Sequence, residues 1–137
     1  MAVWRFFDYR TAALPSRNLI QLWYGEQDRD VQAEFDATVK ILEATEDWRD
    51  TKAFKELTRQ HAGLGEIRFS VRKRIRGREI VRRFRPVGLW IEGARQFTFL
   101  VGCEKSRGMY TPPNAFDLAL RYKADLENGI GDICEHY

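Results

Sequence analysis

Arginine and lysine side chains dominate one stretch of this 137-residue chain, and their types and spacing suit the chemistry of phosphate groups. Residues 65–110 hold twelve of the 23 lysines and arginines and only four acids, for a net charge of +8. The basic residues alternate with apolar residues at a period of two, which predicts strands with a basic face rather than a disordered tail. A folded cationic sheet favours a polyanionic partner, and nucleic acid fits this pattern best.

Four arginines share one face of two neighbouring predicted strands: Arg68, Arg72, Arg83 and Arg85. Guanidinium groups bind phosphates through paired hydrogen bonds and stack on unpaired bases. Lys105, Arg107 and Tyr110 come directly after an apolar segment, in a loop that we expect to overhang these arginines. The alternative interpretation is a solvated sheet face whose edge charges discourage aggregation.

The sequence contains no recognisable cofactor or metal motif. It has no Walker loop, dinucleotide fingerprint, HExxH motif or nucleophile elbow, so we expect neither a cofactor nor a metal. We interpret both histidines, His61 and His136, as surface or helix-capping residues. Two cysteines, Cys103 and Cys134, do not make a disulfide framework, and we expect them to be reduced thiols of an intracellular protein.

The elements that must position these side chains begin with a strand and two helices. The aromatic-rich residues 3–9 predict a first strand. An apolar stripe at helical spacing predicts an amphipathic helix that begins at Asp28 or Asp30 and ends near residue 46. We expect a second helix over residues 51–61.

A hairpin and a central strand follow. Alternating residues predict a strand from residue 66 to 72, a turn at Arg76 and Gly77, and a partner strand over residues 78–85. Arg82 interrupts the alternation of the partner strand, which indicates either a bulge or an inward-facing functional arginine. Residues 96–103 are apolar on both faces, as expected of a central strand.

A last helix is predicted to begin at Thr111 and Pro112 and to end at Gly129. The order of elements predicts a single domain over residues 1–137 of the α+β class, with a small antiparallel sheet and the N-terminal and C-terminal helices packed on one face. No apolar run is long enough to span a membrane and no signal-peptide core is present, so we expect a cytoplasmic protein. Residues 11–27 and 129–137 have no assignment.

Several short motifs occur in an order that resembles a known family. They are Phe54-Lys55-Glu56-Leu57, Gly63-Leu64-Gly65-Glu66-Ile67-Arg68, Arg83-Phe84-Arg85-Pro86, Phe97-Thr98-Phe99-Leu100-Val101-Gly102 with Glu104-Lys105, and Tyr110-Thr111-Pro112 with Ala115, Ala119 and Arg121. Together they resemble the RelE/ParE superfamily of toxins, and within it the phage-derived, HigB-like branch. The resemblance covers about residues 31–122.

This resemblance implies a RelE-like fold and the toxin of a type II toxin–antitoxin system, which acts in the bacterial cytoplasm. Its partners would be a cognate antitoxin of the helix-turn-helix type, the ribosome and mRNA. Many members of the family cut mRNA on the ribosome by helping a ribose 2′ hydroxyl attack the adjacent phosphate. Such an endoribonuclease needs a base, charge stabilisation at phosphorus and a proton donor. Lysine, arginine and tyrosine can supply these without histidine.

The resemblance also implies roles at three positions, namely Arg68, either Arg83 or Arg85, and Lys105. The basic strand face and its adjoining loop supply the other candidates. The catalytic candidates are Arg68, Arg83, Arg85, Lys105 and Tyr110. The candidates for RNA binding are Arg72, Lys73, Arg74, Arg82 and Arg107. Members of the family often carry two lysines or a histidine near residues 105–110, whereas this chain reads Glu104-Lys105-Ser106-Arg107, so the identity of the base stays open.

Two other functions stay open at this point. One is a non-catalytic toxin of the same fold that acts on a protein such as DNA gyrase, as the ParE branch does. The other is a phage-derived nucleic-acid-binding protein without toxin activity. The dense basic sheet and Tyr110 favour RNA, because a toxin that blocks a protein needs no phosphate cradle.

Overall fold

The computed structural model describes residues 3–137, which form three helices, ten strands and three short 3₁₀ turns. The helices are α1 (Leu19–Gly25), α2 (Arg29–Glu43) and α3 (Ala115–Glu127). The strands are β1 (Arg5–Arg10), β2 (Phe54–Glu56), β3 (Leu64–Ile67), β4 (Phe69–Ile75), β5 (Arg78–Phe84), β6 (Val87–Ile91), β7 (Gln96–Val101), β8 (Glu104–Ser106), β9 (Met109–Thr111) and β10 (Asp132–Glu135). The 3₁₀ turns are Trp48–Asp50, Arg59–His61 and Glu92–Ala94.

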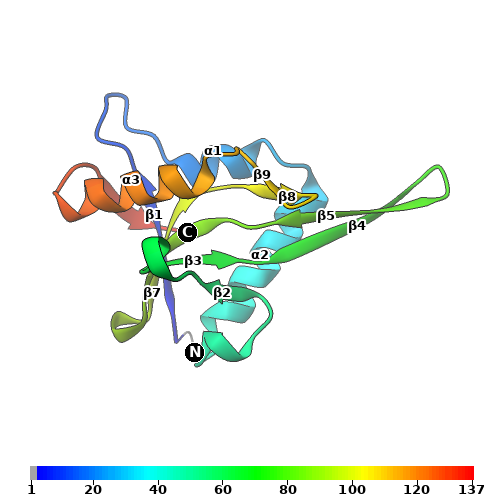
Figure 1. Ribbon diagram of the computed structural model, residues 1–137, viewed down its shortest axis with the longest axis horizontal. Helices are drawn as coiled ribbons and strands as arrows, with labels where there is room; N and C mark the ends of the chain where they lie inside the picture. Colours follow the sequence, from blue (N-terminus) through cyan, green and yellow to red (C-terminus); the bar gives the residue numbers. More distant parts are fainter. Residues whose placement is uncertain (1–2) are drawn as a thin grey trace.

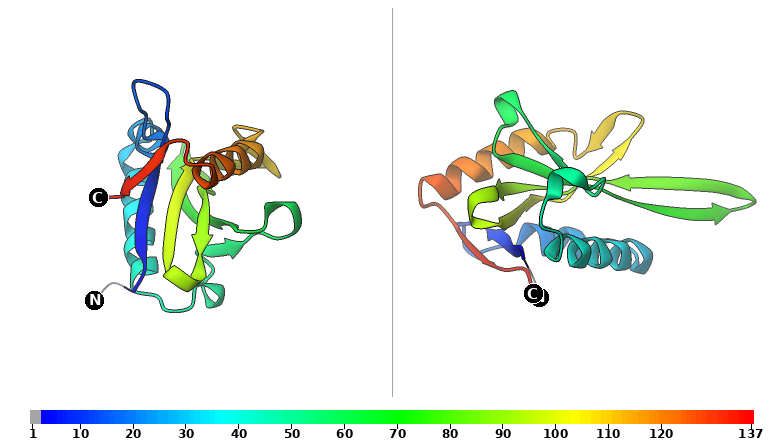
Figure 2. Two further views of the ribbon diagram at one scale, coloured as in Figure 1. Left: turned by 90° about the vertical axis from the view of Figure 1, so that its left-hand side faces the viewer. Right: turned by 90° about the horizontal axis from the view of Figure 1, so that it is seen from below.

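The strands form two sheets, and helices lie on both faces of the larger one. The larger sheet has the order β10-β1-β7-β6-β3-β2, and the smaller has the order β4-β5-β8-β9. Helices α1 and α2 cover one face of the larger sheet and α3 covers the other (Figures 1 and 2). The α+β class is therefore confirmed, but the expected small sheet with all helices on one face is wrong.

The reason for the two-sided arrangement is the apolar character of β7. Phe97 and Phe99 join the core cluster under α2, whereas Leu100 joins the cluster under α3. β7 lies between β1 and β6 in the sheet, so the prediction of a central strand is confirmed for residues 96–101, and residues 102 and 103 lie in the break before β8. The sheet is mixed rather than antiparallel, because β1 and β7 run parallel to each other.

Three long strands pass from the larger sheet into the smaller one. β3 continues into β4, β5 into β6, and β7 into β8, and each passage is interrupted by one or two residues outside the ladder. Arg68 stands at the first break, and Arg85 with Pro86 at the second. The backbone nitrogen of Arg85 donates to the carbonyl of Cys103 at 2.9 Å, which ties the second break to the third. The chain therefore bends along one line, where the candidate arginines gather.

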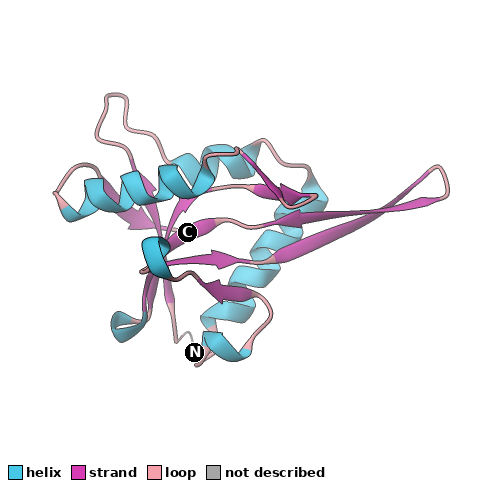
Figure 3. Ribbon diagram, viewed as in Figure 1, coloured by secondary structure: helices cyan, strands magenta, loops and turns pink. Residues whose placement is uncertain are grey.

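The β4–β5 hairpin projects from the body as a two-stranded ribbon (Figures 1 and 3). Its turn residues Arg76 and Gly77 have φ values of 52° and 76°, as a two-residue turn between twisted strands requires. The predicted hairpin and turn are confirmed. Since no helix covers the outer part of the ribbon, its side chains are exposed there.

Helix α2 follows its sequence pattern closely. The Asp28 side chain caps it by accepting from the backbone nitrogen of Val31 at 3.1 Å. The stripe of Val31, Phe35, Val39 and Leu42 is fully buried, and burial of each such side chain contributes about 1.5–3 kcal/mol. The predicted helix is confirmed, with its end at Glu43.

The helix expected over residues 51–61 is wrong. This segment forms β2 and the 3₁₀ turn Arg59–His61, and Phe54 and Leu57 are buried as members of an extended chain. Gly65 on the neighbouring strand explains the difference. A Cβ there would lie 2.4 Å from the ring of Phe54, so the glycine lets Phe54 pack across β3 while β2 pairs with it. Pairing with β3 outweighs the local helical pattern.

The last helix begins at Ala115 rather than at Thr111, because Tyr110 and Thr111 pair with β8 as part of β9. The two unassigned segments also have structure: residues 19–25 form α1, and residues 132–135 form β10 at the edge of β1. Across residues 3–137, no helix is both long enough and apolar enough to cross a membrane.

Candidate functional site

A basic groove lies where the strands bend from one sheet into the other. It has a volume of about 460 Å³ and is lined by Arg68, Arg83, Arg85, Lys105, Arg107 and Gly108. Five side chains proposed from the sequence for catalysis or RNA binding therefore meet around one cavity. We call these five cations and the cavity between them the basic groove.

Strand pairing explains why these side chains meet. Arg83 lies opposite Lys105 in the β5–β8 pair, and Lys105 lies opposite Tyr110 in the β8–β9 pair. Residues directly opposite each other in antiparallel strands project from the same face. The tight turn between β8 and β9 places Arg107 at the rim, with a φ of 51° followed by 78° at Gly108.

The groove carries excess positive charge. Within residues 3–137, Arg83, Arg85, Lys105 and Arg107 form no ion pair with a carboxylate, whereas Arg68 is paired with Glu66. Burial lowers the pKa of Arg85 from its ordinary value, and the neighbouring positive charge of Arg68 lowers it further. Its guanidinium is held by the carbonyl of Phe84, to which Nη1 donates at 2.8 Å. A bound anion would relieve this repulsion between cations.

Glu66 binds Arg68, one of the groove cations, and was not among the sequence candidates. The sequence pattern places it on the solvent face of a strand, yet only 1% of it is exposed. Its Oε1 accepts from Nε and Nη2 of Arg68 at 2.9 and 2.8 Å, and its Oε2 accepts from the hydroxyl of Tyr110 at 3.0 Å. The sequence signal that could have identified Glu66 is its position two residues before Arg68, on the same strand face and inside an otherwise cationic segment.

Tyr110 is packed as well as hydrogen-bonded. Its ring lies 4.7 Å from that of Phe116, and Nζ of Lys105 lies 5.4 Å from the ring centroid. Burial and the charge of Glu66 raise the pKa of the Tyr110 hydroxyl above its ordinary value. The hydroxyl therefore keeps its proton throughout the neutral range.

The outer ribbon extends the groove's face. Ser70 pairs with Arg83 and Arg72 with Val81, so Arg72 and Arg74 project from the same face as Arg83. Arg72 Nη1 donates to Glu79 at 2.6 Å, across the same strand pair. Arg74 is exposed near the turn.

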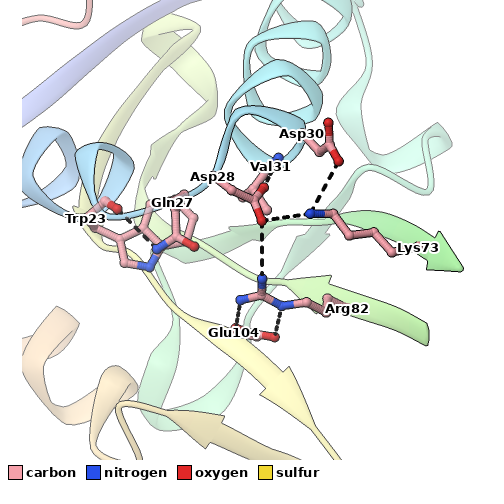
Figure 4. Close-up of polar contacts among 8 residues, drawn as sticks. All are labelled: Trp23, Gln27, Asp28, Asp30, Val31, Lys73, Arg82 and Glu104. Carbon is pink, nitrogen blue, oxygen red and sulfur yellow. Dashed lines mark hydrogen bonds and ion pairs between the residues drawn. The ribbon is translucent and has the colours of Figure 1, made fainter. Parts of the chain in front are cut away.

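Lys73 and Arg82 lie on the opposite face of the ribbon, against the N-terminus of α2 (Figure 4). Lys73 Nζ lies 3.0 Å from Oδ2 of Asp28, and Arg82 forms two hydrogen bonds of 2.8 and 2.9 Å with Glu104. The β4–β5 pairing is regular at Arg82, so the bulge alternative is wrong; the side chain faces α2, and a functional role for it stays a prediction. Because acids pair with both side chains and both lie away from the groove, neither extends its surface.

The two histidines lie outside the groove. His61 packs against the ring of Phe116 at 4.9 Å. The expectation of a surface position for His136 is wrong: it is buried, and its Nδ1 lies 2.7 Å from Oδ1 of the equally buried Asp8. Pairing of β10 with β1 carries His136 there, because its backbone nitrogen donates to the carbonyl of Phe6.

Among the described residues 3–137, no three His, Cys, Asp or Glu side chains are grouped so that they could hold a metal ion. Comparison of the chain with protein-family models, with curated proteins and with solved structures found no match. The groove's own geometry and charge therefore carry the functional argument.

Proposed function

We propose that this protein is the toxin of a type II toxin–antitoxin system and a ribosome-dependent mRNA endoribonuclease, and that the basic groove holds the scissile phosphate. The observation that carries the proposal is the convergence of Arg68, Arg83, Arg85, Lys105 and Arg107 around one cavity. Four of these five charges have no acidic partner among the described residues, so the groove is set up for an anion. The RelE/ParE resemblance of the motifs points to the same chemistry.

The proposed reaction requires little covalent chemistry from the protein. The 2′ oxygen forms a bond to phosphorus, the bond from phosphorus to the 5′ oxygen breaks, and the products are a 2′,3′-cyclic phosphate and a 5′ hydroxyl. Arg83 and Arg85 would stabilise the charge that develops on the phosphoryl oxygens, which is commonly the largest catalytic contribution. Lys105, Arg107 and Tyr110 are the three candidates among which a proton-transfer group would be found.

The RNA on either side of the scissile phosphate would follow the ribbon. Arg72 and Arg74 continue the face of Arg83, so successive phosphates can be neutralised from the groove toward the turn. Single-stranded RNA suits a sheet face of this kind, because its backbone is accessible and its bases can be splayed out.

A cognate antitoxin of the helix-turn-helix type is the proposed partner in the cytoplasm. An acidic or amphipathic antitoxin segment laid over the groove would block RNA by occupying it and by neutralising its charge. Co-expression with the adjacent reading frame should therefore restore growth and yield a complex. If co-expression neither restored growth nor yielded a complex, that result would contradict the antitoxin proposal.

The deciding experiment is primer extension on mRNA in a reconstituted translation system. Wild-type protein should produce new 5′ ends within translated codons, and a variant with Arg68, Arg83 and Arg85 changed to alanine should not. Arg5→Ala is a matched control, since Arg5 lies on β1 and pairs with Glu135 at 3.0 Å, away from the groove. Growth inhibition without cleaved mRNA would support the protein-targeting alternative, and cleavage by the triple variant at the wild-type rate would contradict the assignment.

A further inference from the structure

The hydrogen bonds of Glu66 indicate which residues at the groove can transfer a proton and which are held in position, and this inference rests on the function proposed above. Glu66 is on β3, between Lys55 of β2 and Val87 of β6, and is closed off from solvent. Both of its oxygens are used, one by Arg68 and one by Tyr110. A buried carboxylate is costly unless its lone pairs are satisfied, so all three side chains are held in one arrangement.

A phenol has a single proton to donate. In Tyr110 this proton is committed to Oε2 of Glu66, at 3.0 Å. The hydroxyl can therefore accept a hydrogen bond from the groove but cannot give its proton to a leaving oxygen there. The same arrangement places the Tyr110 ring beside the ammonium group of Lys105.

The arginines of the groove are also poor proton donors. Arginine stays protonated throughout the accessible pH range, which excludes Arg68, Arg83, Arg85 and Arg107 as groups that release and regain a proton. Lysine can lose a proton at far lower cost, and Lys105 is the lysine among the side chains that line the cavity.

We propose that Glu66 is a positioning residue that fixes Arg68 against the phosphate and ties up the hydroxyl of Tyr110, and that Lys105 is the proton donor to the leaving group. In this step the 2′ oxygen bonds to phosphorus and gives its proton to a water-derived base. The electron pair of the breaking bond stays on the 5′ oxygen, which takes a proton from Nζ of Lys105. Lys105 then regains a proton from solvent.

An mRNA with sulfur in place of the 5′ bridging oxygen at the cleavage site tests the assignment, because a thiolate leaves without a proton. On programmed ribosomes, Lys105→Met should slow single-turnover cleavage of the oxygen substrate by about 10²–10⁴-fold. On the sulfur substrate, the cleavage rate of this variant should return to that of the wild type. Glu66→Gln should slow both substrates to the same extent, since it disturbs position rather than proton transfer. Lys40→Met, on the exposed face of α2, is the matched control and should cleave both normally.

Rescue of Tyr110→Phe by the sulfur substrate, with no rescue of Lys105→Met, would overturn the proposal. A second readout does not depend on cleavage. Glu66→Gln should lower the pKa of Tyr110 in an ultraviolet titration, with Tyr110→Phe used to identify its signal, and Glu66→Asp should restore part of the shift. An unchanged Tyr110 titration in a folded Glu66→Gln variant would refute the positioning role. Failure of the wild type to cleave either substrate would instead refute the proposed function, and the titration would still decide the role of Glu66.

Discussion

Arg82 and Arg83 are neighbours in the sequence with the same chemistry, yet they project from opposite faces of β5. Arg83 points into the basic groove, and Arg82 points toward α2 and its acidic partners. We predict that Arg83→Ala weakens RNA binding without loss of stability, and that Arg82→Ala lowers stability without loss of RNA binding. Each variant is the control for the other.

The expected loss of affinity at Arg83 follows from its proposed interaction with one phosphate. A hydrogen bond to a charged group is worth about 1.5–3 kcal/mol, so affinity for single-stranded RNA should fall by about tenfold or more. The slope of log affinity against log salt should become shallower by about 0.7 for each phosphate of a single strand that the variant no longer neutralises. Arg83 is exposed and unpaired with any acid among the described residues, so its removal should change the free energy of unfolding by less than about 0.5 kcal/mol.

The expected loss of stability at Arg82 follows from its interactions with Glu104 and Phe84. The guanidinium forms two hydrogen bonds with Glu104 and lies 5.0 Å from the ring centroid of Phe84. A partly exposed ion pair contributes up to about 1 kcal/mol, and a cation–π interaction about 0.5–1 kcal/mol. Since 38% of the Arg82 side chain is exposed, we expect the free energy of unfolding to fall by about 1–2 kcal/mol in total.

Two measurements on both variants complete the test. Fluorescence anisotropy with a short labelled single-stranded RNA, over about 50–200 mM salt, gives affinity and slope. Urea unfolding followed by circular dichroism gives stability. If Arg82→Ala weakened RNA binding as much as Arg83→Ala, with no change in its unfolding midpoint, the division between the two faces of β5 would be wrong.

Two further predictions concern the fold. Phe99→Ala should lower the free energy of unfolding by about 3–5 kcal/mol, because Phe99 is 1% exposed and lies 5.0–5.5 Å from four other rings. Ile41→Ala, at an exposed position, is the control and should lower it by less than about 0.5 kcal/mol. Equal losses for the two variants in urea unfolding would contradict this account of β7. The Tyr24 hydroxyl donates to Asp36 at 2.7 Å, which raises its pKa from 10.0 to about 12. A raised folded-state pKa stabilises the folded protein below pH 10.0, and this stabilisation disappears as pH rises toward about 12. Tyr24→Phe should therefore lower the free energy of unfolding by about 1 kcal/mol at pH 8 and leave it unchanged near pH 12. A difference between the two proteins that does not depend on pH would contradict this role of the hydrogen bond.

The sequence by itself determined the elements whose signals are local. Asp28 and the apolar stripe after it specify α2, because capping and helical periodicity need no distant partner. Arg76 and Gly77 specify the β4–β5 turn for a similar reason. The two-sided apolarity of β7 specified its central position. The sequence alternation predicted that Arg83 and Arg85 share a face, and both line the groove, although Arg85 lies at the break just after β5.

Where a local sequence pattern competes with pairing to a distant segment, only the tertiary structure decided which secondary structure forms. β2 is a strand because it pairs with β3, and β10 exists because β1 offers it an edge. Neither pairing leaves a clear local signal, since the hydrogen bonds that stabilise a strand come from residues elsewhere in the chain.

The same limit applies to the candidate site. The sequence supplied the cations, but Glu66 looked like a solvent-facing acid, and Arg82 and Lys73 looked like members of the basic surface. Burial of Glu66 and the pairing of Arg82 with Glu104 and Asp28 depend on how the strands bend and where α2 packs. The sequence gives the type and charge of each residue. The tertiary structure determines which of these charges are paired with an opposite charge, because electrostatic interaction depends on distance in space and not along the chain.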